Sequence, residues 1–305
     1  MYPPNDPRRT LAAVAADPIF PLRRPQFIEF DSTRPSNATA AGSLTWFVRS
    51  ENLVIAFTKA KTGDVFDCSS DIDEVAVLLP GDQQSASSVS TATGKSSKSE
   101  AVLGPSSFTV FPAGIASVRS TNDGIVVRIF AARSTGFAER CLNAETYASV
   151  DPNVPTFAPW DDACTALEPV TYDYGAVRPS PGRFGRIFRT DSSMVNVFYP
   201  ESGPRDPSSL SPHSHADFDQ VSLQLDGEYI HHVRAPWGPD SREWQDDVHR
   251  RCTGPAIAIF PPPLIHTSQA IENQRHQLID IFGPPRADFA GRDGWLLNAS
   301  ESTIG

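Results

Sequence analysis

The sequence predicts an all-β protein assembled from two copies of one β-domain. Its 305 residues include 28 prolines and 19 glycines, and the apolar residues fall in short runs rich in Val, Ile and Phe. Many short strands separated by turn-forming residues are typical of β-sandwiches and β-barrels. The chain is also long enough for two domains that each bury a core. The third observation is an internal repeat, which defines the two copies.

Several segments of the first half recur in the same order in the second half, with a period of about 150 residues. Residues 67–81 align without a gap onto residues 213–227, and 111–117 align onto 260–266. Residues 127–130 match 279–282, and 142–144 match 297–299. Matches that keep one order along the chain are hard to obtain by chance, so we interpret the sequence as a duplicated β-domain.

The first copy is expected over residues 46–134, after an N-terminal arm at 1–45 that shows little periodicity. Its strand candidates are 46–49, 53–57, 74–79, 108–111 and 124–130. Residues 82–100 form a low-complexity stretch rich in Ser, Thr and Ala. Such a stretch cannot bury enough apolar surface to order itself, and it predicts a surface loop.

Residues 135–180 are irregular and rich in proline, which predicts a linker between the copies. The second copy is expected over residues 181–290, and its first strand candidates are 186–188 and 194–198. A C-terminal tail at 291–305 follows.

The second copy contains a candidate metal site. His213 and His215 are two residues apart, so on a strand both imidazoles reach the same side. Imidazole is the commonest protein ligand of transition metals. Together with Gln220 and the distant His266, these histidines are expected to hold one divalent metal: Fe, Mn, Ni, Co or Zn. Asp219 is a rival to Gln220 as the fourth ligand.

The first copy lacks these ligands. In the repeat alignment, the four ligand positions correspond to Asp67, Ser69, Glu74 and Ser117, and all seven histidines of the chain lie after residue 212. The first copy is therefore expected to be structural.

At these residues the sequence resembles the cupin superfamily, and the whole chain resembles a bicupin. The first cupin motif, G-x5-HxH-x3–4-E-x6-G, is matched from His213 to Gly227, with Gln220 in place of the usual Glu. The second motif, PxGxxHxxxN, is matched by Pro261 to His266, although Pro263 replaces its glycine. The resemblance implies two double-stranded β-helix (jelly-roll) domains, and the family spacing selects Gln220 over Asp219.

The last strand of the second copy resembles that of single-domain cupins with a His-His-Gln-His site, some of which open unsaturated uronates. Their Asp-x-Phe-x-x-x-Arg signature falls on Asp280, Phe282 and Arg286. The resemblance implies that Asp280 moves a proton and that Arg286 holds an anionic group. The alternative is a structural ion pair between the two. Tyr229 and Phe218, with Phe282, are candidate residues of the substrate pocket, and core packing is the alternative for Tyr229 and Phe218.

Three functions are compatible with these residues. The first is a metal-dependent enzyme that isomerises or tautomerises a small oxygenated organic or sugar acid. Three imidazoles and an amide add no negative charge, which leaves the metal a strong Lewis acid. The second is an Fe(II)-dependent dioxygenase of an aromatic or diketone substrate. The third is a non-catalytic binding or storage bicupin.

Composition limits the partners. The net charge is −10 and the pI is near 5.1, which argues against nucleic acid or an anionic membrane as a partner. The N-terminus shows no long apolar leader, and no apolar run reaches membrane-spanning length, so we expect a cytoplasmic protein. The four cysteines show no CxxC spacing and are expected to be reduced. A small-molecule substrate is expected, and a homodimer is compatible with the resemblance.

Overall fold

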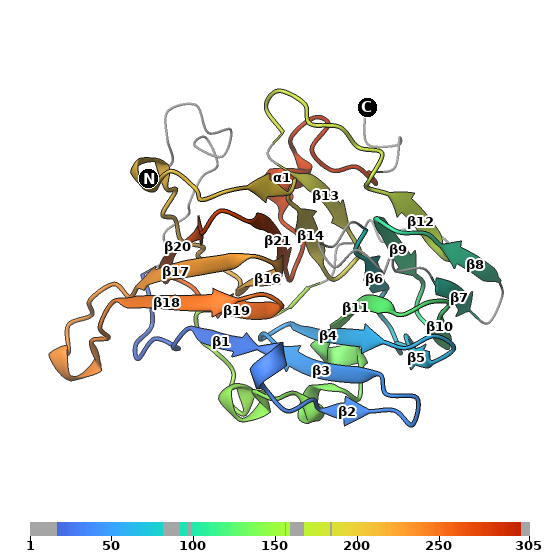
Figure 1. The fold of residues 1–305 in the computed structure, drawn as a ribbon. Helices are drawn as coiled ribbons and strands as arrows, with labels where there is room; N and C mark the ends of the chain where they lie inside the picture. Colours follow the sequence, from blue (N-terminus) through green and yellow to red (C-terminus); the bar gives the residue numbers. More distant parts are fainter. Residues whose placement is uncertain are drawn as a thin grey trace.

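The computed structural model describes residues 17–81, 92–96, 99–155, 157–158, 168–183 and 185–299. Within these ranges the chain forms four antiparallel sheets, joined by loops, short 3-10 helices and one α-helical turn (Figure 1). The all-β prediction is confirmed. Parts of the predicted arm, low-complexity loop, linker and tail fall outside the described residues. Nowhere in the described ranges does a helix combine the length and apolar character needed to span a membrane.

The first half contains a large and a small sheet. The large sheet has the strand order β12-β9-β6-β11-β4-β3-β2. Its strands are β2 (Asn37–Ala38), β3 (Leu44–Arg49), β4 (Leu53–Ala60), β6 (Val75–Leu79), β9 (Ser107–Phe111), β11 (Gly124–Ala131) and β12 (Val170–Asp173). The small sheet has the order β5-β10-β7-β8. Its strands are β5 (Val65–Asp67), β7 (Ala92–Ser96), β8 (Glu100–Leu103) and β10 (Ala116–Ser120).

The second half repeats this arrangement. Its large sheet has the order β1-β19-β16-β21-β14-β13, with β15 paired to β21. The strands are β1 (Gln26–Glu29), β13 (Arg186–Arg189), β14 (Met194–Val197), β15 (Glu201–Ser202), β16 (Gln220–Asp226), β19 (Ala256–Phe260) and β21 (Arg275–Phe282). The small sheet β18-β17-β20 is formed by β17 (Glu228–Arg234), β18 (Val248–Thr253) and β20 (Ile265–Ile271).

Short helices occupy the connections in the described residues. The 3-10 helices are η2 (Phe30–Ser32), η3 (Ala132–Ser134), η4 (Ala138–Arg140), η5 (Ala144–Tyr147), η6 (Pro207–Ser209) and η7 (Ser241–Glu243), and the α-helical turn is α1 (Ala287–Ala290).

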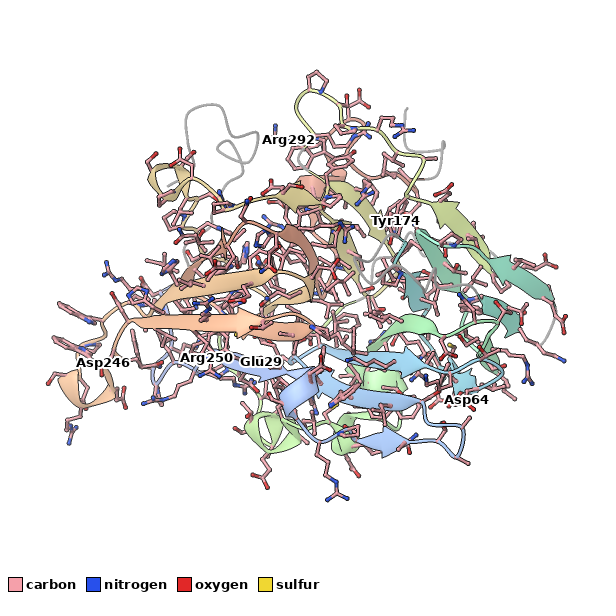
Figure 2. All side chains as sticks on the ribbon, viewed as in Figure 1. Glu29, Asp64, Tyr174, Asp246, Arg250 and Arg292 are labelled. Carbon is pink, nitrogen blue, oxygen red and sulfur yellow. The ribbon has the colours of Figure 1, made fainter. Side chains whose placement is uncertain are left out.

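Both large sheets are completed by a strand from outside the repeat. Strand β1 of the N-terminal arm pairs with β19 of the second half, and β12 of the linker pairs with β9 of the first half. Glu29 of β1 also lies beside Arg250 of β18, with 3.4 Å between Oε1 and Nη2 (Figure 2). The arm and the linker therefore each cover an edge that would otherwise be open.

The two large sheets pack against each other and bury a shared apolar core. Alternate residues of each strand enter this core, including Ala76 and Leu78 of β6, and Val221 and Leu223 of β16. The remaining residues of the same strands face the interior of their own half. In β6 these are Val75, Val77 and Leu79, which pack in a second apolar core inside the first half.

The interior of the second half is polar where the first is apolar. In β16 the inward residues are Gln220, Ser222 and Gln224, all buried, and in β21 they include His276 and Asp280. Buried polar groups require hydrogen-bond partners or a ligand. The second half therefore has the interior in which a site can be built.

The strand registers correct the repeat alignment by one residue. Asp67 lies opposite Ser117 as His213 lies opposite His266, which agrees with the alignment. In the sheets, however, Val75 lies opposite Phe111 as Gln220 lies opposite Phe260. The counterpart of Gln220 is therefore Val75 and not Glu74, because the loop before β6 is one residue longer than the loop before β16.

Two buried carboxylates join the halves in a reciprocal way. Asp219, just before β16, accepts a hydrogen bond from the backbone N–H of Glu51 through Oδ2 (2.6 Å). Glu74, just before β6, accepts one from the backbone N–H of Asp191 through Oε2 (2.9 Å). Burial raises the pKa of each side chain to about 7, and the neighbouring Asp191 carboxylate adds to this for Glu74.

Glu74 is expected to make stability depend on pH. Its pKa is 4.5 when solvated and about 7 when folded, so the folded state binds the proton more tightly. Stability from this group is complete below about pH 4.5 and declines as the pH rises through 7. The variant Glu74→Gln keeps the acceptor but cannot ionise. We expect its stability relative to the native protein to increase by roughly 1–3 kcal/mol between pH 5 and 8.

Denaturant titrations at both pH values measure this difference, and the exposed Glu145→Gln provides a matched control. A stability difference that is independent of pH would show that Glu74 does not carry this effect.

Candidate metal centre

Three histidines of the second half converge. One ring nitrogen from each of His213, His215 and His266 lies within 4.8 Å of the others. His213 lies directly opposite His266 and is held there by reciprocal backbone hydrogen bonds of 3.1 and 2.8 Å. His215 follows two residues later, and its ring centroid is 5.0 Å from that of His213 and 5.4 Å from that of His266. The backbone pairing between His213 and His266 therefore brings the three imidazoles together.

Hydrogen bonds at Nδ1 fix the tautomers of two of these rings. His213 Nδ1 donates to the Ser211 carbonyl (2.9 Å), and His266 Nδ1 donates to the Leu264 carbonyl (3.0 Å). Each histidine thus uses the carbonyl two residues earlier, which leaves Nε2 as a lone-pair donor. Nε2 of His266 is buried and has no hydrogen-bond partner in the described residues. An unsatisfied buried acceptor of this kind fits a metal ligand.

Gln220 completes the group. Its Oε1 lies 2.7 Å from His215 Nε2, so both prospective ligand atoms point at one place. Its Nε2 donates to Ser222 Oγ (3.1 Å), and Ser222 Oγ donates to Asp280 Oδ1 (2.6 Å). This chain orients the amide oxygen towards the histidines. Asp219, the rival ligand, is instead bound to the backbone of Glu51.

The buried imidazoles are neutral at physiological pH. Burial, helped by the neighbouring His213, Arg286 and His266, holds the pKa of His215 well below its usual range. Burial also lowers the pKa of His266 to about 4. A metal would therefore not have to compete with protons for these two nitrogens near neutral pH.

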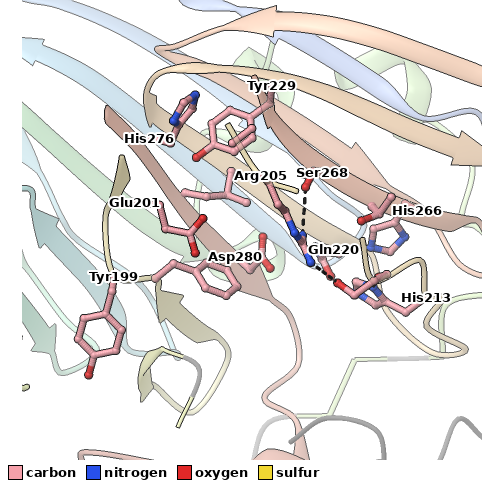
Figure 3. Close-up of a pocket in the computed structure, with 15 residues that line it drawn as sticks. Tyr199, Glu201, Arg205, His213, Gln220, Tyr229, His266, Ser268, His276 and Asp280 are labelled. Atoms are coloured by element: carbon pink, nitrogen blue, oxygen red, sulfur yellow. Dashed lines mark hydrogen bonds between the residues drawn. The ribbon is translucent and has the colours of Figure 1, made fainter. Parts of the chain in front are cut away.

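The metal centre opens into a cavity of about 260 Å³ (Figure 3). Its walls come from β16, β17, β20, β21 and the segment 198–213. The lining residues are Phe198, Tyr199, Glu201, Arg205, Ser211, His213, Gln220, Tyr229, His266, Thr267, Ser268, Ala270, His276, Leu278 and Asp280. The lining thus includes Tyr229, Asp280 and all predicted ligands except His215, which is buried.

Phe218 and Phe282, predicted as pocket residues, are not among the residues that line this cavity. Both belong to an apolar cluster with Phe289 and Trp295. The Phe218 ring stacks on His215 with 4.4 Å between centroids, and Phe282 packs against the edge of the same imidazole at 6.1 Å. These two rings therefore pack against the prospective ligand His215 and do not line the cavity.

Arg286 also lies outside the cavity lining. Its Nε and Nη2 form a bidentate pair with Asp288 at 2.9 and 2.5 Å, and its guanidinium lies 4.0 Å from the centre of the Phe289 ring. Arg286 thus pairs with Asp288 and not with Asp280, the alternative that the sequence left open, and its role in holding a substrate anion stays a prediction. The register of β21 does not determine the direction of the chain after Gly283. The turn there places Arg286 next to His215 but outside the cavity lining.

The cation of the cavity is Arg205, which sequence reasoning missed. It donates to the Ser268 carbonyl (3.3 Å), the Ser209 carbonyl (3.2 Å) and Ser211 Oγ (3.1 Å), and points towards the metal centre (Figure 3). It belongs to no repeating pattern. The only sequence feature that marks it is its position shortly before His213, because a segment that leads into His213 must lie at the same end of the second half.

The other end of the cavity carries Glu201, Tyr229 and His276. Glu201 lies opposite His276 in the pairing of β15 and β21. His276 Nε2 donates to the Ile271 carbonyl (2.6 Å), and its Nδ1 is a buried acceptor without a partner among the described residues. His276 lies in β21, so the strand pairing fixes its position.

The first half fills the corresponding space differently. Arg128 occupies the position of Asp280, because it lies opposite Val77 as Asp280 lies opposite Ser222. Its buried guanidinium donates to the Asp67 carbonyl (2.5 Å), at the counterpart of His213. A fixed cation at this position opposes a metal ion.

Comparisons with known proteins agree with the fold. No family model matches the chain, and no curated protein matches it by sequence. Solved structures do match. An oxalate decarboxylase from Lactobacillus farciminis, in a formate complex, has a TM-score of 0.54 and 11% identity over 85% of this chain and 86% of its own. A single-residue mutant of the oxalate decarboxylase OxdC from Bacillus subtilis has a TM-score of 0.52 and 13% identity over 84% and 76%.

AerE from Microcystis aeruginosa has a TM-score of 0.51 and 9% identity over 86% of this chain and 97% of its own. Another matching structure concerns the Mn(II) centres of the Bacillus subtilis oxalate decarboxylase. At these identities the likeness concerns the fold. The chain therefore has the fold of these proteins, with duplicated antiparallel sheets, and it carries a histidine triad that could bind a metal.

Loss of a single imidazole is expected to remove the metal. We expect His266→Ala to lower the bound transition metal from near one per chain to near zero, because the remaining ligands cannot close the site. Metal analysis of purified protein measures this. The exposed His249→Ala is the matched control and should retain the metal. Equal metal content in both variants would contradict the assignment.

Proposed function

We propose that this chain is a bicupin of the cupin superfamily and a metal-dependent enzyme that isomerises or tautomerises a small hydroxylated carboxylic acid or sugar acid. The observation that carries the proposal is the buried Nε2 of His266 within a histidine triad, which has no hydrogen-bond partner among the described residues. This triad opens into a cavity of about 260 Å³ that also holds the guanidinium of Arg205 and the carboxylate of Asp280. A cation, a carboxylate and a metal site in one small cavity are typical of an active site.

His213, His215, Gln220 and His266 would hold the metal. When bound, it would supply Lewis-acid polarisation of a substrate oxygen. None of these four groups carries negative charge in its neutral form, so the positive charge of the metal would remain available to the substrate. Nitrogen and amide oxygen donors suit Mn, Fe, Co, Ni or Zn.

Arg205 is suited to bind the carboxylate of the substrate. Its guanidinium is oriented by two backbone carbonyls and by Ser211. A guanidinium has five N–H donors, and a pre-oriented one can bind a carboxylate with little loss of side-chain freedom. This would fix the acid end of the substrate next to the histidines.

Asp280 is suited to move the proton. It is buried on β21, lines the cavity and accepts a hydrogen bond from Ser222 Oγ. Ser222 also accepts from Gln220, so the carboxylate is held in a defined relation to the prospective ligand shell. A carboxylate fixed beside the substrate can remove a proton from one carbon or oxygen and return it to another.

The opposite end of the cavity favours hydroxyl groups. The carboxylate of Glu201 and Nδ1 of His276 are acceptors, and the Tyr229 hydroxyl can donate or accept. Two acceptors are best satisfied by the O–H groups of a ligand. This supports a hydroxy acid or a sugar acid as the substrate class.

The decisive experiment combines metal analysis with oxygen and substrate assays. The metal-loaded enzyme is incubated with uronates, small hydroxy acids, oxalate, catechols and diketones, and products are followed by NMR in deuterated water. We expect deuterium incorporation into a sugar or hydroxy acid without oxygen consumption. Oxygen uptake with an aromatic or diketone substrate would instead establish a dioxygenase. Metal binding without turnover of any class would favour a binding or storage protein.

Asp280→Asn is expected to lower kcat by about 10²- to 10⁴-fold, the usual contribution of a general acid or base. Asn can still accept the Ser222 hydrogen bond, so bound metal should stay unchanged. Steady-state kinetics with parallel metal analysis measure both. The surface variant Asp247→Asn is the matched control, since Asp247 pairs with exposed Arg234. Unchanged kcat in Asp280→Asn would remove this residue from the reaction.

A further inference from the structure

A second cavity, of about 290 Å³, lies between the two halves. The first half contributes Pro80, Gly81 and Ser106, and the segment after β12 contributes residues 174, 175 and 177–179. The second half completes it with residues that include Arg186, Tyr199, Asp226 and Arg275. Tyr199 also lines the metal cavity, so this inter-half cavity and the metal cavity share one wall.

The inter-half cavity contains a buried cation without an acidic partner in the part of the chain that the structure describes. Arg186 is 6% exposed, and its guanidinium donates to the carbonyls of Tyr174, Val197 and Phe198 at 2.7 to 3.3 Å. It lies 4.8 Å from the ring centres of both Tyr174 and Tyr199. Figure 2 labels Tyr174 near the junction of the halves. Carbonyls and ring faces supply only partial negative charge, so the buried positive charge is not neutralised.

The other charged groups of the cavity leave an excess of positive charge. Arg275 forms an ion pair with Asp226. Arg178 is exposed at the cavity and has no acidic partner among the described residues. The lining therefore combines Arg178, Arg186 and Arg275 with the single carboxylate of Asp226. This local excess occurs on a chain whose net charge is −10, so it does not follow from the overall composition.

We propose that the inter-half cavity binds a small oxyanion, a phosphate or a carboxylate, independently of the metal. Arg186 has N–H groups beyond the three that bind carbonyls, and Arg178 has no acidic partner in the described ranges, so the two guanidinium groups provide donors from different segments. Planar guanidinium groups match the oxygens of phosphate and carboxylate through charge-assisted hydrogen bonds. An anion there would neutralise Arg186 and join residues of both halves.

The test titrates inorganic phosphate and malonate into the metal-loaded protein by isothermal calorimetry at constant ionic strength. We expect saturable binding of one or both, and their relative affinity identifies the preferred oxyanion. Arg178→Ala should weaken binding about tenfold, because it removes one charge-assisted contact. Arg186→Met should abolish it. Since Arg186 is buried and its variant could fail to fold, the exposed Arg178→Ala decides the question in that case.

Two controls separate this site from other anion binding. Arg119→Ala, an exposed arginine of the first half, should bind the anions as the native protein does. His213→Ala, which disables the metal centre, should also retain binding. The proposal is overturned by an absence of saturable binding, or by Arg178→Ala binding the anions as tightly as Arg119→Ala does, which would place the anion elsewhere, for example at Arg205.

Discussion

The site depends on the burial of β16 and β21 on both faces. One face of each strand packs in the core between the large sheets, and the other faces the interior of the second half. Because side chains alternate strictly along a strand, Val221 and Leu223 cannot leave the shared core without turning Gln220 and Ser222 away from the histidines. The packing between the halves thus fixes the register on which the candidate metal ligands depend. The first half contributes to the site through this packing, although it contributes no ligand.

The two halves share one arrangement of strands but have different interiors. In the first half the inward positions of β6 are Val75, Val77 and Leu79, and the interior is an apolar core containing the buried Arg128. In the second half the corresponding positions of β16 are Gln220, Ser222 and Gln224. An apolar interior is stable by itself, whereas a polar one must be satisfied by its own hydrogen bonds and by a ligand. The chain of bonds from Asp280 through Ser222 to Gln220 meets part of this requirement, and the open Nε2 of His266 marks the remainder.

The sequence predicted the fold and named the three histidines that converge in the structure, because both depend on local spacing and on repeated strand patterns. His213 and His266 could be paired through the repeat, since their backbone partners recur at Asp67 and Ser117. The positions that failed depend on loops. One extra residue before β6 displaced Glu74 from the assigned position, and the turn after Gly283 carried Arg286 to Asp288. Arg205 could not be identified because no periodicity reports where a loop side chain points.

The exchange of edge strands has a consequence for biosynthesis. Strand β1 is made first, yet its partner β19 lies more than half the chain later, and β9 must wait for β12 of the linker. On the ribosome, the first half can close its large sheet once the linker has emerged, while β1 stays without its partner until the second half is nearly complete. Such long-range pairing slows folding and leaves an unpaired strand exposed in the meantime. It also means that neither half is a self-contained module. A cut in the linker before β12 would separate β1 from its partner β19 and β12 from its partner β9.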